Sequence, residues 1–304
     1  MSSLTEPHDR TACVICGGAR ITAVARFAAV HMVRCATCGT RFAGRAPSDS
    51  ELDAHYRTYG EWPDSAITRK RYRELLAGFE RYRGKGRIFD MGCGAGYFLE
   101  EAATLGWSPH GSNVGERSIT MCRAKGLDVV SAPVVEGAFP DGHFDVATAF
   151  EVFEHLRDPA QEAQTLARLI RPGGLLYCTT PNYDSLSRRL LGSRWRVISY
   201  PEHLIYFTAA SLSGWLERYG FRTLSVTSTG ISLDDLRAAA IRGSRGPAGS
   251  SHGTAAGSGR EEWLRAATET GRLMPSVKGA FNRGLSATQT GDTLKGLFIR
   301  TSDP

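Results

Sequence analysis

The chain has 304 residues, of which 41% are hydrophobic, so it can build the core of one large domain or of two smaller ones. It contains no uninterrupted apolar segment near the roughly 20 residues that a membrane span needs, and MSSLTEPHDR lacks the apolar middle of a signal peptide, so a cytoplasmic protein outside the membrane is expected. The net charge of +6 and the pI near 9.0 favour an anionic partner only weakly, because many basic proteins bind nothing acidic.

Four cysteines near the N-terminus form two Cys-x-x-Cys pairs, CVIC and CATC, on either side of a short β-rich stretch. This spacing supplies four thiolates that can surround one zinc ion tetrahedrally, and four reduced thiols in a small core are the alternative. Zinc with four sulfur ligands has no open position for chemistry, so it should stabilise a module too small to fold alone. We therefore predict a structural zinc ribbon over residues 1–48. The predicted zinc ligands are Cys13, Cys16, Cys35 and Cys38.

Residues 49–83 are predicted to connect this module to the rest of the chain. A short helix is expected first, and then ITRKRYRELLAGFERYR places aromatic and leucine side chains at helical spacing. Arg and Lys residues fill the other face, which is more typical of a solvated helix surface than of a binding patch.

From residue 84 the pattern changes to short strands that alternate with helices, which is typical of a parallel sheet covered on both faces. The predicted strands cover residues 87–91, 108–112, 128–131, 144–149, 175–180, 221–228 and 294–300. The predicted helices cover residues 96–105, 116–125, 159–171 and 208–219. We expect an α/β fold with a Rossmann-like, doubly wound sheet of seven strands. Six of them belong to the core at residues 84–242, and a helix and the closing strand within 261–304 complete it. Residues 243–260 are rich in Gly and Ser and are expected to form a flexible loop.

The first strand of this core ends in FDMGCGAGYF, and a helix is expected to follow. Glycines at such a turn let the backbone approach a ligand closely, and the start of the helix offers unpaired N–H groups. The spacing G-x-G-x-G differs from the G-x-G-x-x-G of dinucleotide-binding turns. It favours S-adenosylmethionine as the ligand.

The stretch Asp90-Met-Gly-Cys-Gly-Ala-Gly resembles motif I of class I S-adenosylmethionine-dependent methyltransferases. Phe144-Asp-Val, Glu154-His155-Leu, Pro172-Gly-Gly and Pro181-Asn182 lie where that family carries its later motifs, so the resemblance covers about residues 84–228. Together with the ribbon, the chain is similar to bacterial methyltransferases of sugar, polysaccharide and natural-product pathways. The cofactor-binding residues that this resemblance implies are Asp90, Gly92, Gly94, Gly96, Asn113 and Phe150.

Asn113 departs from the family pattern, which has an acidic residue there to accept both ribose hydroxyls. An amide oxygen still accepts one hydrogen bond but loses the charge-assisted pair. We therefore expect weaker cofactor binding, or help from Glu116.

The stretch AFEVFEHLRDP follows the fourth predicted strand of the core and carries two carboxylates and an imidazole. If it forms one helical turn, Glu151, Glu154 and His155 share one face. They could be structural, or His155 could be a general base, or the face could bind a divalent cation with His203 of PEHLIYF. The Glu-x-x-Glu-His pattern with a distant His is similar to the metal site of small-RNA terminal 2′-O-methyltransferases and of some ubiquinone-pathway O-methyltransferases. That resemblance implies Glu151, Glu154, His155 and His203 as ligands of a second divalent cation, and His155, His203 and Glu154 as catalytic residues.

The predicted reaction moves the methyl group of S-adenosylmethionine to an oxygen of a small hydroxyl-bearing acceptor, such as a sugar or a natural-product intermediate that is anionic or glycosylated. An RNA methyltransferase is one alternative, but the chain lacks a sustained basic run with interleaved aromatic residues, so nucleic acid is not the expected partner. The second alternative is a scaffold that binds the cofactor without turnover, and the departure from the family pattern at Asn113 supports it. The sequence makes no prediction of the oligomeric state.

Overall fold

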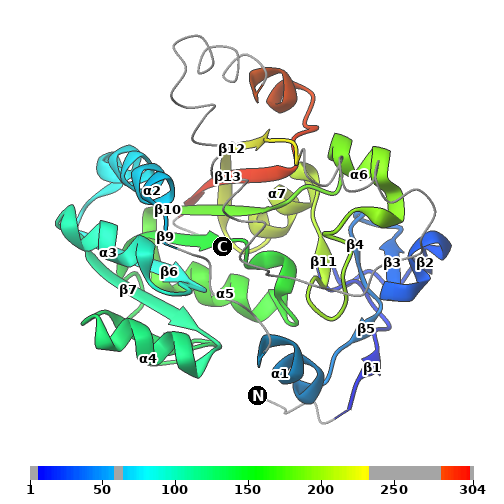
Figure 1. Ribbon diagram of the computed structural model, residues 1–304, viewed down its shortest axis with the longest axis horizontal. Helices are drawn as coiled ribbons and strands as arrows, with labels where there is room; N and C mark the ends of the chain where they lie inside the picture. The colour runs from blue at the N-terminus through cyan, green and yellow to red at the C-terminus, as the bar shows by residue number, and fades with distance from the viewer. Residues whose placement is uncertain (1–5, 58–63, 233–281, 302–304) are drawn as a thin grey trace.

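The computed structural model describes residues 6–57, 64–232 and 282–301 (Figure 1). The predicted loop 243–260 and the helix predicted for residues 261–281 lie outside these residues. Within them, every helix is too short or too polar to cross a membrane.

A seven-stranded sheet forms the centre of the molecule, with the strand order β12-β13-β10-β9-β6-β7-β8. β13 is antiparallel to both of its neighbours, whereas the strands from β10 to β8 are parallel. This order confirms the predicted Rossmann-like sheet, and all seven predicted strands are present. Their bounds are β6 (Arg87–Met91), β7 (Ser108–Asn113), β8 (Asp128–Ser131), β9 (Phe144–Phe150), β10 (Ile170–Pro181), β12 (Phe221–Thr229) and β13 (Thr293–Arg300).

Helices cover both faces of the sheet because successive strand residues point to opposite sides. Ile88 of β6 packs in the cluster formed with α2, α3 and α4, and Phe89 packs in the cluster formed with α5 and α7. These helices are α2 (Ala66–Phe79), α3 (Tyr97–Thr104), α4 (Glu116–Ala124), α5 (Pro159–Leu169) and α7 (Ala209–Glu217).

The predicted helix 159–171 ends two residues early. Ile170 and Arg171 begin β10, where Ile170 pairs with Phe144 of β9. The Arg171 side chain donates a hydrogen bond to the buried Asp145 carboxylate at 2.7 Å, which ties the start of β10 to β9. Pairing of β10 with β9 therefore ends the helix before its apolar pattern ends.

The N-terminal module packs on the end of the core beside α6 (Leu186–Leu191), far from α4 (Figure 1). Its main sheet is antiparallel with the order β11-β4-β3-β2, and β1 pairs with β5. β11 comes from the core, so the module and the core share a sheet and part of one hydrophobic cluster. The bounds are β1 (His8–Asp9), β2 (Ile21–Ala23), β3 (Met32–Cys35), β4 (Arg41–Ala43), β5 (Arg45–Ala46), α1 (Asp49–Arg57) and β11 (Ile205–Tyr206).

Candidate active site

The glycine-rich turn between β6 and α3 has three residues with left-handed backbone angles. φ is 71° at Gly92, 53° at Gly94 and 81° at Gly96. A Cβ at Gly92 would meet Val152 at 2.7 Å, and one at Gly96 would meet Leu127 at 2.6 Å, so a side chain at either position would force its neighbour to move. A Cβ at Gly94 would have no neighbour within 4 Å. Gly94 is thus the point at which the turn faces open space that a ligand can enter.

Asp90 is the penultimate residue of β6, just before this turn, and is 2% exposed. Thr148 donates a hydrogen bond to its Oδ1 at 2.6 Å. Burial raises the pKa of Asp90 to about 7, which the Thr148 hydrogen bond only partly opposes. The carboxyl therefore changes its charge near neutral pH, directly before the glycine-rich turn.

Asn113 ties the glycine-rich turn to the next loop. Its side-chain N–H donates to the carbonyl of Gly94 at 3.3 Å, and its Oδ1 accepts from the N–H of Gly115 at 3.3 Å. An aspartate could not donate to the Gly94 carbonyl. The amide therefore has a structural reason to replace the acidic residue.

Phe150 lies at the carboxyl end of β9 in a group of aromatic rings. Its ring centre is 5.5 Å from Tyr72 of α2, 5.1 Å from Phe98 of α3 and 5.7 Å from Tyr177 of β10. The predicted cofactor residue is thus half-buried between α2, α3 and the sheet. This cluster fixes the position of α2 beside the glycine-rich turn.

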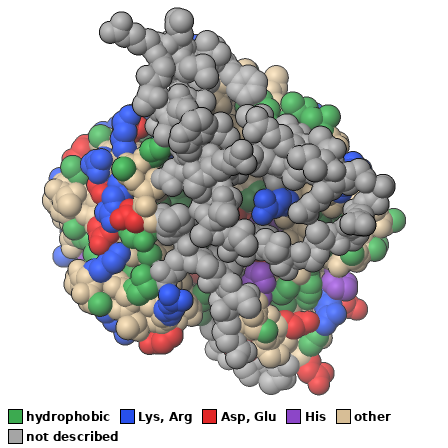
Figure 2. Space-filling model, viewed as in Figure 1, with side chains coloured by type: hydrophobic (Ala, Val, Ile, Leu, Met, Phe, Trp, Pro, Cys, Tyr) green, Lys and Arg blue, Asp and Glu red, His purple; other side chains and the backbone are tan. Residues whose placement is uncertain are grey.

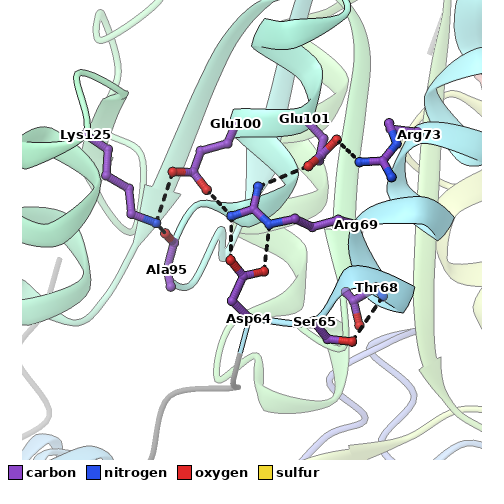
Figure 3. A network of polar contacts seen from close by, with 9 residues as sticks. All are labelled: Asp64, Ser65, Thr68, Arg69, Arg73, Ala95, Glu100, Glu101 and Lys125. Atoms are coloured by element: carbon purple, nitrogen blue, oxygen red, sulfur yellow. Dashed lines mark hydrogen bonds and ion pairs between the residues drawn. The ribbon is translucent and has the colours of Figure 1, made fainter. Parts of the chain in front are cut away.

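An ionic network between α2, α3 and Lys125 stabilises the glycine-rich turn (Figure 3). Lys125 donates to the carbonyl of Ala95 at 2.8 Å and pairs with Glu100 at 3.3 Å. Arg69 of α2 pairs with Glu100 at 2.7 Å, and also with Asp64 and Glu101. The prediction that the basic face of α2 is solvated was therefore wrong for Arg69, because carboxylates of α3 lie against that face.

Glu154, His155 and His203 converge at the carboxyl edge of the sheet, and each offers a ligand atom within 4.8 Å of the others. Glu154 and His155 come from η3 (Phe153–His155), directly after β9, and His203 precedes β11. The two imidazole ring centres are 4.8 Å apart, and His155 Nε2 lies 3.9 Å from Glu154 Oε1. The structure thus joins residues that are 48 positions apart in the sequence, as the cation hypothesis requires.

Backbone carbonyls set the tautomer of both imidazoles. His155 Nδ1 donates to the carbonyl of Glu202 at 2.8 Å, and His203 Nδ1 donates to the carbonyl of Val197 at 2.7 Å. A carbonyl only accepts, so Nδ1 carries the hydrogen and Nε2 keeps its lone pair in the neutral ring. Burial lowers the pKa of His155 to about 4, with His203 as the next cause, so that ring is neutral near pH 7. Metal-binding histidines commonly show this arrangement.

The Glu154 carboxyl is buried, and Thr180 of β10 donates to its Oε2 at 2.9 Å. Burial, followed by the charge of Glu151, holds the pKa of Glu154 well above its usual range. A bound cation would offset the free-energy cost of burying the ionised Glu154 carboxylate. One carboxylate and two imidazoles suit manganese, iron or zinc.

The backbone of Glu151 lies outside the helical turn, although its side chain still contacts Glu154. The φ of Glu151 is 52°, and its N–H donates to the carbonyl of Thr179 at 3.0 Å, so the chain is still bonded to β10 at this point. The helical turn begins only at Phe153. The prediction that Glu151, Glu154 and His155 share one helical face was therefore wrong for Glu151.

The four N-terminal cysteines lie together, with all four sulfur atoms within 4.8 Å of one another. The Sγ atoms of Cys13 and Cys38 are 3.6 Å apart, and those of Cys16 and Cys35 are 3.5 Å apart. Tetrahedral bonds of about 2.3 Å to zinc would separate the sulfurs by about 3.8 Å. The cluster therefore fits one zinc ion with a ligand pair from each knuckle.

Sequence reasoning found the three converging side chains but missed the groups that orient them. Thr180, Glu202 and Val197 act on the site through a hydroxyl or through backbone carbonyls. A carbonyl carries no residue-type signal, so no sequence pattern could have identified the last two.

A family model described as "Methyltransferase domain" matches residues 66–226. The "Ubiquinone biosynthesis O-methyltransferase" of Bordetella pertussis is 37% identical over 108 residues, 33% of this chain and 45% of that protein. The protein of the same name from Colwellia psychrerythraea is 29% identical over 154 residues, 46% of this chain and 63% of that one. The chain spans about half the length of the curated relatives that it matches.

Solved structures share the fold. The "putative sarcosine dimethylglycine methyltransferase" of Galdieria sulphuraria superposes with a TM-score of 0.50 at 16% identity, over 77% of this chain and 86% of that one. A "SAM dependent methyltransferase" of Archaeoglobus fulgidus has a TM-score of 0.50 at 19% identity, over 77% and 93%. At these identities the likeness concerns the fold.

Proposed function

This chain belongs to the methyltransferase domain family, and we propose that it transfers the methyl group of S-adenosylmethionine to a hydroxyl oxygen of a small acceptor. The convergence of Glu154, His155 and His203 is the observation that carries this proposal. Glu154 and His155 follow β9, and His203 precedes β11. The glycine-rich turn follows β6, which is the parallel neighbour of β9. Both groups therefore lie at the same carboxyl edge, where ligands bind in open α/β sheets.

We assign Glu154, His155 and His203 as ligands of a divalent cation. When bound, the cation would lower the pKa of an acceptor hydroxyl and orient it, which suits a vicinal diol or a catechol. The sequence pattern alone nominates Glu151 as a further ligand. The carbonyls of Glu202 and Val197 keep the imidazoles in the ligating tautomer, and the glycine-rich turn positions the methyl donor.

The direct test incubates the purified protein with S-adenosylmethionine and catechol and analyses the products by mass spectrometry. A product heavier by one methylene group, together with S-adenosylhomocysteine, is expected. Methylation of an amine, or of RNA ends but of no small-molecule diol, would contradict the proposed acceptor class.

We expect S-adenosylmethionine to bind more tightly as the pH rises from 6 to 8. Asp90 has a pKa of about 7, so it gains its negative charge in this interval and then attracts the amino group of the cofactor. The change in Kd by calorimetry should approach about tenfold. Asp90→Asn should abolish this part of the pH dependence. A variant that keeps the full dependence would place the titrating group elsewhere.

We propose one structural zinc ion at Cys13, Cys16, Cys35 and Cys38. Cys35→Ser should lose this zinc and lower the thermal midpoint, because metal binding supplies much of the folding free energy of such a module. The measurement is metal content by plasma mass spectrometry beside a thermal melt. Cys178→Ser changes a buried thiol of β10 outside the cluster and should retain the zinc. Equal zinc in the two variants would contradict the assignment.

A further inference from the structure

Two arginines, one from the N-terminal module and one from the core, stack on one buried tyrosine ring. Tyr183 follows β10 and is 4% exposed. The guanidinium carbon of Arg41, on β4, lies 4.6 Å from its ring centre, and that of Arg188, on α6, lies 4.4 Å from it. The stacking fixes two positive charges close together at the junction of module and core.

Neither guanidinium group has a carboxylate within ion-pair distance among residues 6–57, 64–232 and 282–301. Arg41 donates to the carbonyl of Gly39 at 3.2 Å, and Arg188 donates to the carbonyl of Tyr183 at 2.6 Å. Both side chains belong to half-buried residues. By contrast, Arg69 engages three carboxylates. The charge of Asp184 acts on Arg188 from outside ion-pair distance. The pair therefore retains N–H donors that no carboxylate of the described residues occupies as an ion pair.

The pair lies at the carboxyl edge of the sheet, on the side of the candidate metal group. Thr180, which donates to Glu154, precedes Tyr183 by three residues on the same strand end. Arg41 pairs with Tyr206 in the β4–β11 register, and β11 begins two residues after His203. Figure 2 shows how Lys, Arg and His side chains are distributed among the other types on the face viewed in Figure 1. One acceptor molecule could therefore contact both groups.

We propose that Arg41 and Arg188 bind an anionic group of the acceptor, a carboxylate or a phosphate, while its hydroxyl groups reach the candidate metal ligands. This inference rests on the proposed function, since it concerns the acceptor of the same reaction. Guanidinium groups match oxyanions with two parallel N–H donors, and a half-buried pair of like charges gains most when an anion arrives. Tyr183 is then the positioning residue for both arginines.

The test measures binding, so it does not depend on turnover. Calorimetry in the presence of S-adenosylhomocysteine compares catechol, 3,4-dihydroxybenzoate and the phosphate monoester of 4-hydroxymethylcatechol. The unaltered protein should bind at least one anionic catechol about tenfold or more tightly than catechol, and the two anionic probes distinguish carboxylate from phosphate. Arg188→Gln and Arg41→Gln should each reduce this preference by about tenfold and leave the affinity for catechol unchanged.

Two further variants separate a binding role from a structural one. Arg189→Gln removes the same charge from an exposed neighbour on α6 and should keep the preference. Arg188→Lys keeps the charge but loses the planar donor pair, so its preference should be intermediate. Equal affinities of the unaltered protein for all three probes, no binding of the anionic probes, or an undiminished preference in both glutamine variants would overturn the inference. If the unaltered protein prefers an anionic probe but methylates none of the probes, the result would support this inference and contradict the proposed function.

Discussion

Replacing Gly94 by asparagine should abolish S-adenosylmethionine binding and leave the fold intact. The φ of 53° at Gly94 lies in the left-handed region, which asparagine adopts more readily than most residues. The new side chain would start in a space without any protein atom within 4 Å, so it collides with a ligand and not with the protein. We expect Kd to rise about 100-fold or more by calorimetry, because the turn can no longer approach the cofactor closely.

Gly106→Asn is the matched control for this experiment. Gly106 follows α3 with a φ of 78°, and a Cβ there also has no neighbour within 4 Å. Both variants should lose about 1 kcal/mol of stability through the same backbone cost. Only Gly94→Asn should lose the cofactor. Micromolar binding by Gly94→Asn would remove Gly94 from the cofactor site.

The fold was predictable because its signals are local and periodic. Strands such as β6, β9 and β13 contain short apolar runs bounded by turn residues, and FDMGCGAGYF marks the first strand, its turn and the start of α3. β11 and α6 were missed because two and six residues are too few to show a period. Their positions depend on packing against the N-terminal module, which is a contact between distant parts of the chain.

The candidate active site was predictable where a side chain supplies the chemistry. Glu154, His155 and His203 were all named from residue types, and the structure brings them together. The backbone of Glu151 was not predictable, because a hydrogen bond to Thr179 on another strand sets it. The surroundings of Arg69 were missed for the same reason, since Glu100 and Glu101 reach α2 only after α3 has docked.

Removing the proposed divalent cation should abolish methyl transfer without unfolding the protein. A chelator is applied under conditions in which plasma mass spectrometry shows that the cysteine-bound zinc stays in place, and magnesium, manganese, iron and zinc are then added back singly. We expect one or more of these ions to restore activity on catechol. Full activity in protein that retains only the structural zinc would eliminate the cation.

Variants of the ligands locate the effect. His203→Ala and Glu154→Gln should each lower kcat about 100-fold or more, because the acceptor hydroxyl then lacks the activating ion. His143→Ala is the control, since this half-buried histidine precedes β9 at the opposite end of the strand from Glu154 and His155. Full activity in both His155→Ala and His203→Ala would show that Glu154, His155 and His203 have only a structural role.

The pH dependence of ion binding supplies a readout that does not involve turnover. Burial and the charge of Glu151 hold the pKa of Glu154 well above its usual range. Ion binding favours the ionised carboxylate, so we expect proton release from Glu154 at any pH below this raised pKa. His155 has a pKa of about 4 and contributes no proton near neutral pH. Ion affinity should therefore rise with pH, and calorimetry in buffers of different ionisation enthalpy should detect the released proton. Glu154→Gln should lose this proton release along with most of the affinity, whereas an unchanged proton release would assign the titrating group to a residue other than Glu154.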